Sequence, residues 1–404
     1  MKFGVGGRRW LVAVAAVAVL GTSACGGGAA QGGDASVTKD GVTTYKMGVA
    51  MALSGSQAAL GQDFVTFVKY GVEDANKEYK KDGFQIDLVT EDTAGTADVG
   101  LKAFNKLASI EQAPVVFTAW SAVVKAMAPA SKDVGVALIN SGANSPELEG
   151  AGENLRNFFP LASNDVAAVS TYMAVHEKKK RAAIIHVDNA TGQGAAEVYK
   201  KSFEKAGGEI VATESIRQDA VDASAQVAKV LAAKPDTIHV HALLGEAPVI
   251  FKALREQGST VPLTTYAGLG EAVAVRTASG AAMDGLIYTT LANTSPEDPK
   301  IASLVERFKK EKNREPAGLS YDVYMYDSAF FFAELIKGIR AADKPVTGEN
   351  ILKAIDDTDS FPLPLQRSTE FTDTGIVRKQ VILKKIGTTA DNPARDKAIA
   401  TIEP

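Results

Sequence analysis

The sequence predicts an α/β protein built from two doubly wound lobes of mainly parallel sheet, joined by a hinge. Buried strand patterns alternate with amphipathic helix patterns, and this alternation begins again near Asp165. Such alternation is typical of βαβ units, in which helices cover both faces of a parallel sheet. The chain has 404 residues, which is enough for two lobes that each bury a core.

The first lobe starts with Met47–Leu53, an almost wholly apolar run that is expected of a strand buried on both faces. A helix is predicted over residues 62–80, because apolar residues such as Phe64 and Val68 recur on one face at helical spacing. Strand and helix patterns then continue to alternate. The further strands expected in this lobe are 84–89, 114–119 and 136–140, with helices over 101–110 and from Ser121 onward.

The second lobe shows the same rhythm. Its expected strands are 182–187, 210–213, 237–241 and 285–289, and its expected helices are 195–205, 223–232 and 248–257. The chain should then return to the first lobe near Leu291 and form a helical stretch over residues 301–339. The expected divisions of the mature chain are lobe 1 (44–162 and 292–372), lobe 2 (163–291 and 373–390) and a C-terminal tail (391–404).

Residues 1–24 are predicted to be a lipoprotein signal peptide. Positive charges that include Arg8 and Arg9 precede an apolar segment, residues 10–20, which has signal-peptide length and is too short to span a bilayer. The small residues before Cys25 resemble the cleavage box of a bacterial lipoprotein, although that box usually has leucine where this chain has Thr22. The alternatives are an ordinary secretory signal with an incidental cysteine and, from the arginine pair, the twin-arginine export route.

The segment that follows the signal is predicted to tether the folded part to a membrane. Residues 25–43 begin with Cys25, the chain's one cysteine, and are rich in Gly and Ala. Such a composition buries too little apolar surface to order itself. Lipidation of Cys25 would make the protein an extracytoplasmic one, anchored to the cell membrane by its lipid.

Composition and motifs argue against several classes of function. The net charge is −4, so the chain has no excess of basic residues for binding nucleic acid. It has no complete dinucleotide fingerprint, no phosphate-binding P-loop and no nucleophile elbow. His239 and His241 point to one face of a predicted strand, but no third metal ligand is evident. We therefore expect no enzyme activity, no metal and no cofactor.

Several stretches resemble the Leu/Ile/Val-binding protein family of type I periplasmic binding proteins. The matching motifs are GVAMALSGSQAALG, VVFTAWS, VGVALINSGANSPEL, RAAIIHVDNATGQG and LLGEAPVIFKALREQG. The resemblance covers roughly residues 45–386. It implies that a monomer captures a small solute between two hinged lobes and delivers it to an ABC permease. The alternative is an extracytoplasmic solute sensor of the same fold.

The resemblance also implies which residues contact the ligand. Ser121 matches a serine that holds the ligand's carboxylate together with helix-start amides, and a helix N-terminus suits an anion physically. The alternative is that Ser121 only caps the helix. Asn144 follows a strand end where the family binds ligand, but a plain turn is possible there too. The expected contacts are Leu60, Trp120, Ser121, Gly142, Ala143, Asn144, Thr191, Leu243 and Gly268.

Three of these positions depart from the amino-acid binders of the family. Gly268 stands where those proteins have an acidic residue that pairs with the ligand's ammonium, and Leu60 and Leu243 replace two tyrosines. We therefore expect an organic acid or amide with an apolar body, and Gly268 is expected to leave room for a larger ligand.

The counter-hypothesis is that another acid replaces the missing one. The candidates are Glu271, Glu246 and Asp165. Glu271 has a second interpretation, since a carboxylate there could instead stabilise a helix start.

Overall fold

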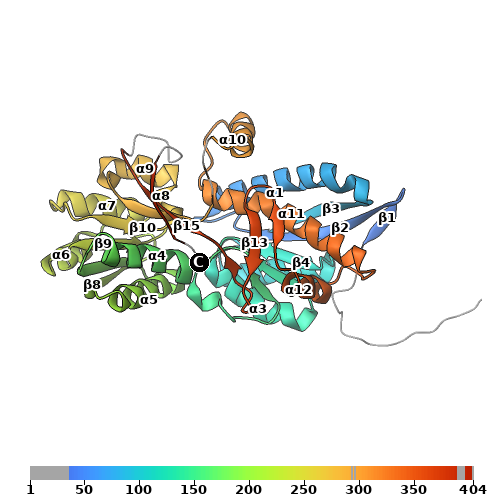
Figure 1. The fold of residues 1–404 in the computed structure, drawn as a ribbon, viewed down its shortest axis with the longest axis horizontal. Helices are drawn as coiled ribbons and strands as arrows, with labels where there is room; N and C mark the ends of the chain where they lie inside the picture. The colour runs from blue at the N-terminus through green and yellow to red at the C-terminus, as the bar shows by residue number, and fades with distance from the viewer. Residues whose placement is uncertain (1–35, 293, 295–296, 389–395, 403–404) are drawn as a thin grey trace, which may run out of the picture.

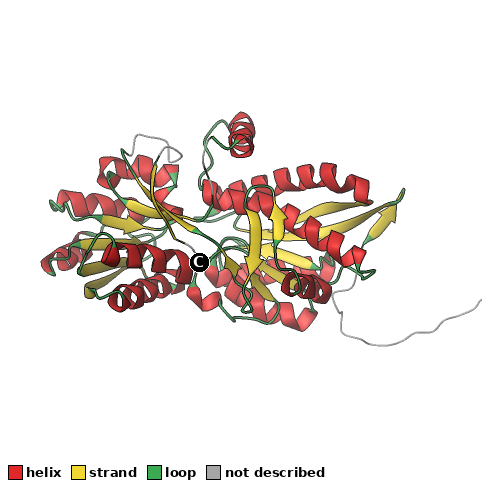
Figure 2. Cartoon of the chain, in the orientation of Figure 1, coloured by secondary structure: helices red, strands yellow, loops and turns green. Residues whose placement is uncertain are grey.

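The computed structural model describes residues 36–292, 294, 297–388 and 396–402. The predicted signal peptide and Cys25 lie outside these residues. Two α/β lobes follow one another along the long axis of the molecule (Figures 1 and 2). Among the described residues, lobe 1 contains a six-stranded sheet in the order β1-β2-β4-β5-β6, with β3 paired to β2, and lobe 2 contains a seven-stranded sheet in the order β16-β15-β11-β10-β9-β7-β8.

The sheet of lobe 1 is parallel except for β1, which pairs with β2 in the antiparallel direction. The last residues of β2 are buried, as the apolar run predicted. The strands are β1 (Val37–Lys39), β2 (Val42–Met51), β3 (Phe84–Asp92), β4 (Val115–Thr118), β5 (Ala137–Asn140) and β6 (Leu155–Asn157).

The β1–β2 hairpin lies within the segment that we assigned to the tether. Asp40 and Gly41 connect its strands, with φ angles of 53° and 77°. Two successive residues with positive φ form the tight turn that joins antiparallel strands, and Asp-Gly is a favoured pair for it. The tether assigned to residues 25–43 therefore overlaps the sheet from Val37 onward. The Asp-Gly pair was the signal that our sequence reasoning missed.

Helices cover both faces of the lobe 1 sheet. One core packs α1, α11 and α12 against one face, and a second core packs α2 and α3 against the other. The helices are α1 (Ala58–Tyr79), α2 (Ala97–Asn105) with the π-helix η2 (Lys106–Ile110), α3 (Ser121–Val134), α10 (Pro299–Lys312), α11 (Leu319–Ala341) and α12 (Gly348–Asp356), with the 3-10 turns η1 (Lys80–Asp82) and η3 (Pro146–Leu148).

Lobe 2 repeats this architecture. Its strands β7 to β11 are parallel, and β15 and β16 add an antiparallel edge. The strands are β7 (Arg181–Val187), β8 (Glu209–Ile216), β9 (Thr237–His241), β10 (Leu263–Thr265), β11 (Ile287–Thr290), β15 (Val381–Lys385) and β16 (Lys397–Ile402). Residues 397–402, which we placed in a C-terminal tail, thus belong to this sheet.

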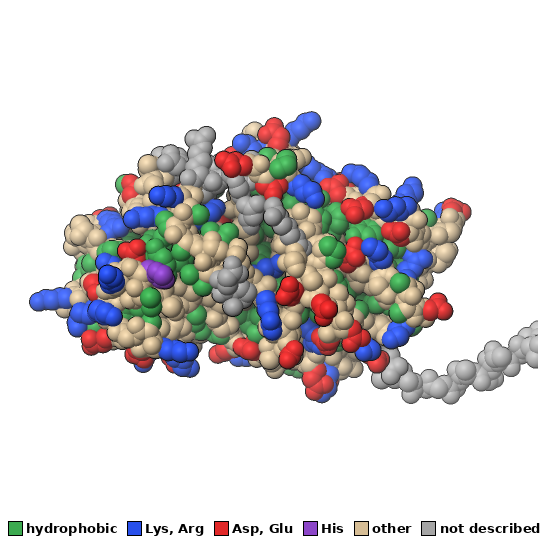
Figure 3. All heavy atoms as spheres, in the orientation of Figure 1, with side chains coloured by type: hydrophobic (Ala, Val, Ile, Leu, Met, Phe, Trp, Pro, Cys, Tyr) green, Lys and Arg blue, Asp and Glu red, His purple; other side chains and the backbone are tan. Residues whose placement is uncertain are grey.

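The helices of lobe 2 also form two layers. Helices α4 and α5 cover one face of the sheet, and α6, α7 and α9 cover the other. The helices are α4 (Ala162–Val175), α5 (Ala190–Lys205), α6 (Ser224–Ala232), α7 (Ala247–Glu256), α8 (Ala267–Gly270) and α9 (Val273–Ser279), with the 3-10 turn η4 (Gly280–Met283). The space-filling view shows acidic and basic side chains interspersed over the face it presents (Figure 3).

Within the part of the chain that the structure describes, three crossovers join the lobes: between β6 and α4, between β11 and α10, and between β14 and β15. A small sheet of β12 (Phe361–Leu363), β13 (Arg367–Phe371) and β14 (Val377–Arg378) precedes the third crossover. It packs on lobe 1, because Phe361 and Phe371 both contact the ring of Phe331. None of the described helices is both long and apolar enough to cross a membrane.

The predicted helical stretch over residues 301–339 is in fact two helices. Helix α10 ends at Lys312, its C-cap Asn313 has a φ of 54°, and α11 starts at Leu319. The left-handed conformation at a helix end stops the helix, and asparagine tolerates it. The resulting loop, residues 313–318, reaches the interface between the lobes, as the next subsection describes.

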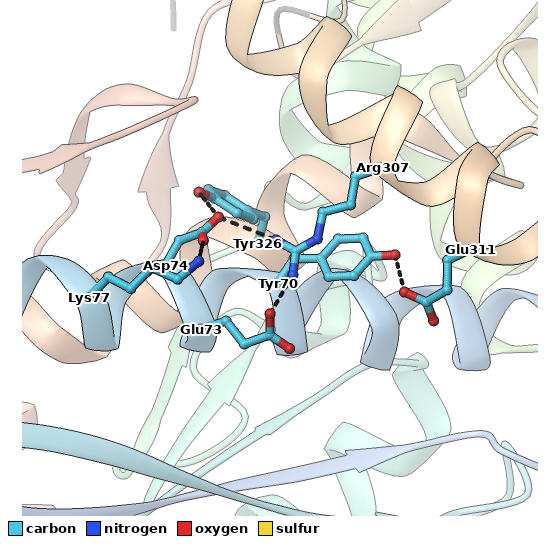
Figure 4. A network of polar contacts seen from close by, with 7 residues as sticks. All are labelled: Tyr70, Glu73, Asp74, Lys77, Arg307, Glu311 and Tyr326. Carbon is cyan, nitrogen blue, oxygen red and sulfur yellow. Dashed lines mark hydrogen bonds and ion pairs between the residues drawn. The ribbon is translucent and has the colours of Figure 1, made fainter.

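A polar network holds α10 on lobe 1 (Figure 4). The guanidinium of Arg307 lies 3.8 Å from the centre of the Tyr70 ring, pairs with Glu73 and lies 3.4 Å from Asp74. The hydroxyl of Tyr70 donates to Glu311 over 2.5 Å. These contacts join α10 to α1, so α10 belongs with lobe 1 although it follows a crossover from lobe 2.

Candidate functional site

A cavity of about 80 Å³ lies between the two lobes. Because a single water needs at least about 10–15 Å³ by this measure, the space can hold several waters or one small organic molecule. Lobe 1 contributes Gln57, Leu60, Phe64, Trp120, Ser121, Gly142, Ala143, Asn144, Ala317, Gly318 and Tyr321, and lobe 2 contributes Thr191, Leu243, Leu244, Tyr266 and Gly268.

The structure brings every ligand contact expected from the sequence to this one cavity. Sequence reasoning missed Gln57, Phe64, Leu244, Tyr266, Ala317, Gly318 and Tyr321. Tyr266 directly follows β10, a three-residue strand that was not predicted, so the strand-end rule could have found it. Tyr321 begins an aromatic run that the sequence does show, but nothing local places that run beside the cavity.

Ser121 is not the N-cap of α3, contrary to the alternative interpretation. Trp120 holds the cap position, with a φ of 65° and no capping side chain, and Ser121 is the first helical residue. A positive φ at a tryptophan costs about 1–3 kcal/mol, and such strain clusters at functional sites. The Ser121 hydroxyl instead accepts hydrogen bonds from the Ser145 amide (3.3 Å) and the Thr191 hydroxyl (3.1 Å).

Two helices begin at the cavity, one from each lobe. The first amides of α3 and α5 have no preceding turn of helix to bond to, so both helix starts present N–H groups and positive dipole ends. At α5 the side chain of Asn189 accepts from the Gly192 amide over 3.0 Å, and Thr191 lies in the same turn. A negatively charged or strongly dipolar oxygen is therefore favoured between Ser121 and Thr191.

Asn144 adds a further polar group to this end of the cavity. The residue is 5% exposed, and its Nδ2 has no hydrogen-bond partner among the residues described. A buried amide without a partner is costly, at about 1–3 kcal/mol. Nδ2 is the donor in the assigned orientation of the amide. A ligand oxygen in the cavity would satisfy this donor.

Aromatic side chains form much of the remaining wall. Phe64 lies next to Trp120 and Tyr321, with ring centres 5.7 Å and 5.8 Å apart. Tyr266 stacks on the buried ring of His241 at 4.1 Å. The wall is thus built largely from rigid apolar surfaces, which suit an apolar ligand body.

Gly268 does not leave room for a larger ligand, and our expectation on this point was wrong. A Cβ at this position would collide with the ring of Tyr266 and would lie 2.9 Å from the hydroxyl oxygen of Tyr321. The space that a side chain would take is therefore filled by two tyrosines, one from each lobe. Glycine is required here for their close approach.

Among the described residues that line the cavity, none is acidic or basic. Each of the three candidate acids has a structural partner instead. Glu271 accepts from the amide and hydroxyl of Ser320 at the start of α11, which agrees with the helix-start interpretation. Glu246 accepts from the backbone amides of Leu243 and Asp219. Asp165 accepts from the backbone amide of Val166 and from the hydroxyl of Thr289.

The two histidines on β9 belong to the interior of lobe 2. His239 bonds through Nδ1 to the Thr264 hydroxyl over 3.0 Å, and its ring lies 4.4 Å from that of Tyr199. Burial lowers the pKa of His241 to about 3, so its ring is neutral. Within the described residues no group of three or more potential metal ligands exists. His241 supports the Tyr266 wall from behind.

The lobes are in contact around the cavity. The Ser121–Thr191 hydrogen bond and the Glu271–Ser320 pair both join lobe 1 to lobe 2. Helix α5 also approaches η3 closely, since a Cβ at Gly194 would lie 2.8 Å from Pro146. This arrangement corresponds to a closed cleft.

Comparison with known proteins identifies the family. A model of the periplasmic binding protein family matches residues 44–390, and the chain belongs to this family. The family is extracytoplasmic, and its members are solute-binding proteins rather than enzymes. An amino acid binding protein of Pseudomonas aeruginosa is 26% identical over 312 residues, which cover 75% of this chain and 81% of the relative.

Two solved structures show the same fold with different ligands. A solute-binding protein of an R. palustris ABC transporter, in complex with 4-hydroxybenzoate, has a TM-score of 0.77 and 19% identity over 89% of this chain and 97% of its own. The branched-chain amino acid binding protein of Streptococcus pneumoniae, in complex with isoleucine, has a TM-score of 0.73 and 22% identity over 89% of this chain and 100% of its own.

Proposed function

We propose that this member of the periplasmic binding protein family is the substrate-binding subunit of an ABC importer. It captures a small organic acid or amide between its lobes and delivers it to a membrane permease. The observation that carries this proposal is the cavity shared by both lobes, with Ser121 and Thr191 at two converging helix starts. Closure on the solute gives a permease a way to distinguish the loaded protein from the empty one.

The charge-free lining supports an acid or amide over a free amino acid. An enclosed amino acid would lose the water around its ammonium group, and an unpaired buried charge costs several kcal/mol. The position that matches the ammonium partner is Gly268, and Glu271 is bonded to Ser320. A carboxylate or amide oxygen, in contrast, meets Ser121, Thr191 and the two helix starts. The apolar walls then receive the rest of the ligand.

The proposal includes a lipid anchor on Cys25. The support for it is the apolar segment of signal-peptide length, followed by small residues and the chain's one cysteine. A lipid anchor keeps the protein close to the membrane that holds its permease.

Calorimetry and thermal-shift measurements with a panel of solutes test the ligand class. The panel contains aromatic and aliphatic acids, short amides, and leucine, isoleucine and valine. We expect acids or amides to bind and to stabilise the protein, by about 2.7 kcal/mol at a hundredfold excess over Kd. Micromolar or tighter binding of any of the three amino acids would overturn the ligand class, and failure of every acid and amide to bind would overturn the proposed function.

A further inference from the structure

Two tyrosines reach the cavity, but only one of them has its hydroxyl already bonded inside the protein. The hydroxyl of Tyr266 donates to the carbonyl of Ala242 over 2.9 Å. The hydroxyl of Tyr321, in the first turn of α11, has no hydrogen-bond partner within the part of the chain that the structure describes. Tyr321 is 8% exposed and lines the cavity. Buried hydroxyls in proteins are nearly always hydrogen-bonded, so a ligand atom in the cavity is the expected partner of this one.

The ring of Tyr321 is held on both sides. Phe64 stacks on it at 5.8 Å and Phe159 at 4.7 Å, each with an angle of 18° between the ring planes. A ring packed in this way cannot turn its hydroxyl towards another part of the protein without opening the core. The hydroxyl is therefore fixed in position before a ligand arrives, and a fixed donor loses little entropy on binding.

The absence of a side chain at Gly268 leaves space for the Tyr321 hydroxyl. Any side chain at Gly268 would start 2.9 Å from the Tyr321 oxygen and would also collide with Tyr266. Burial raises the pKa of Tyr321 well above its usual range, so the hydroxyl keeps its proton and can donate. Ser121 and Thr191 lie on α3 and α5, whereas Tyr321 lies on α11. The Tyr321 hydroxyl is therefore a polar group of the cavity separate from those two helix starts.

We infer that Tyr321 is a specificity-determining residue whose hydroxyl binds a second polar group of the ligand. This inference rests on the proposed function. The first polar group, a carboxylate or amide, lies at Ser121 and Thr191. The second is a hydroxyl or carbonyl oxygen on the apolar body. The protein therefore prefers hydroxy- or oxo-substituted acids to their unsubstituted analogues, because an analogue leaves the Tyr321 hydroxyl unpaired.

The test compares two variants against matched pairs of acids. Calorimetry measures the Kd of benzoate and 4-hydroxybenzoate, and of pentanoate and 4-oxopentanoate, for the wild type, Tyr321→Phe and Tyr324→Phe. We expect the wild type to prefer the substituted member of at least one pair by about tenfold. Tyr321→Phe should remove this preference by weakening the substituted acid alone. Tyr324→Phe is the control and should retain the preference, since Tyr324 lies on the same helix but outside the cavity lining, with its hydroxyl bonded to the carbonyl of Leu291.

Two results would overturn the inference while leaving the proposed function intact. In the first, the wild type binds both members of each pair equally well. In the second, Tyr321→Phe keeps the preference for the substituted acid. If no acid or amide of the wider panel binds to the wild type, the proposed function fails and the inference falls with it. Thermal unfolding of both variants checks that each still folds.

Discussion

Thr191 donates a hydrogen bond to Ser121 across the cleft, with 3.1 Å between the two hydroxyl oxygens. Thr191 lies in the first turn of α5 in lobe 2, and Ser121 is the first residue of α3 in lobe 1. One hydrogen bond thus joins the starts of two helices from opposite lobes at the wall of the cavity. A ligand oxygen placed here would contact both lobes at once, which would couple binding to closure.

Ser121→Ala should weaken binding of the tightest-binding acid of the panel far more than it weakens the fold. We expect a loss of about 1–3 kcal/mol in binding, because a donor to a charged oxygen is removed. The free energy of unfolding should fall by less than about 1 kcal/mol, since Trp120 and not Ser121 holds the cap position. Calorimetry and urea denaturation measure the two quantities. Equal losses in both would mean that Ser121 is structural only.

A bulky residue at Gly194 should hold the lobes apart. The site for its Cβ lies 2.8 Å from Pro146 of the other lobe, so Gly194→Leu cannot be accommodated with the cleft closed. We expect a larger radius of gyration than wild type by small-angle scattering and an affinity at least tenfold lower. Gly338→Leu is the control, because a Cβ there meets nothing within 4 Å. An unchanged scattering profile for Gly194→Leu would contradict this account of closure.

Glu271→Gln should destabilise the protein without creating or removing amino-acid binding. The carboxylate accepts two hydrogen bonds from Ser320 at the positive end of α11, and a neutral amide binds there more weakly. We expect the free energy of unfolding to fall by about 1–2 kcal/mol in urea denaturation. If the wild type binds leucine and Glu271→Gln abolishes that binding selectively, Glu271 is the ammonium partner after all.

The free energy of unfolding should fall as the pH rises from about 4 to about 7, because over this range Asp165 keeps its proton in the folded state but loses it in the unfolded state. Burial raises the pKa of this carboxyl from 3.8 to about 7 in the folded state. Between the two values the folded state binds more protons than the unfolded one, so stability is present below the unfolded pKa and is lost as pH rises through the folded pKa.

The substitution Asp165→Asn isolates this contribution. The amide oxygen of asparagine can still accept from Val166, but the side chain no longer titrates. Urea denaturation of variant and wild type at a series of pH values should give a stability difference that shifts in favour of the variant between pH 4 and 7. A difference that is independent of pH would show that Asp165 does not titrate in this range.

Cys25→Ala should release the protein from the membrane. If Cys25 carries the lipid, the variant loses its acyl chains and moves out of the membrane fraction. Mass spectrometry of the wild type should show the lipid on the N-terminal cysteine of the mature chain. A wild type without lipid, together with a variant that stays in the membrane fraction, would contradict the anchor.

The sequence by itself determined the architecture, because strand and helix periodicity is a local property. The strand predicted over residues 237–241 is β9 (Thr237–His241), and α3 starts at Ser121 as expected. The resemblance to a known family also indicated nine residues that line the cavity, and most of them follow a strand end of a parallel sheet. Even the Asp40-Gly41 hairpin, which we missed, carries its own local signal.

Only the tertiary structure decided what fills the cavity and what is free within it. Tyr321 and the neighbouring loop reach the site from a helix far along the chain, and Phe64 and Phe159 fix the Tyr321 ring by packing. The sequence shows that position 268 is a glycine, but only the fold shows that two tyrosines fill the space of the missing side chain. Close packing joins residues that are distant in the chain, and no local pattern records which neighbours will meet.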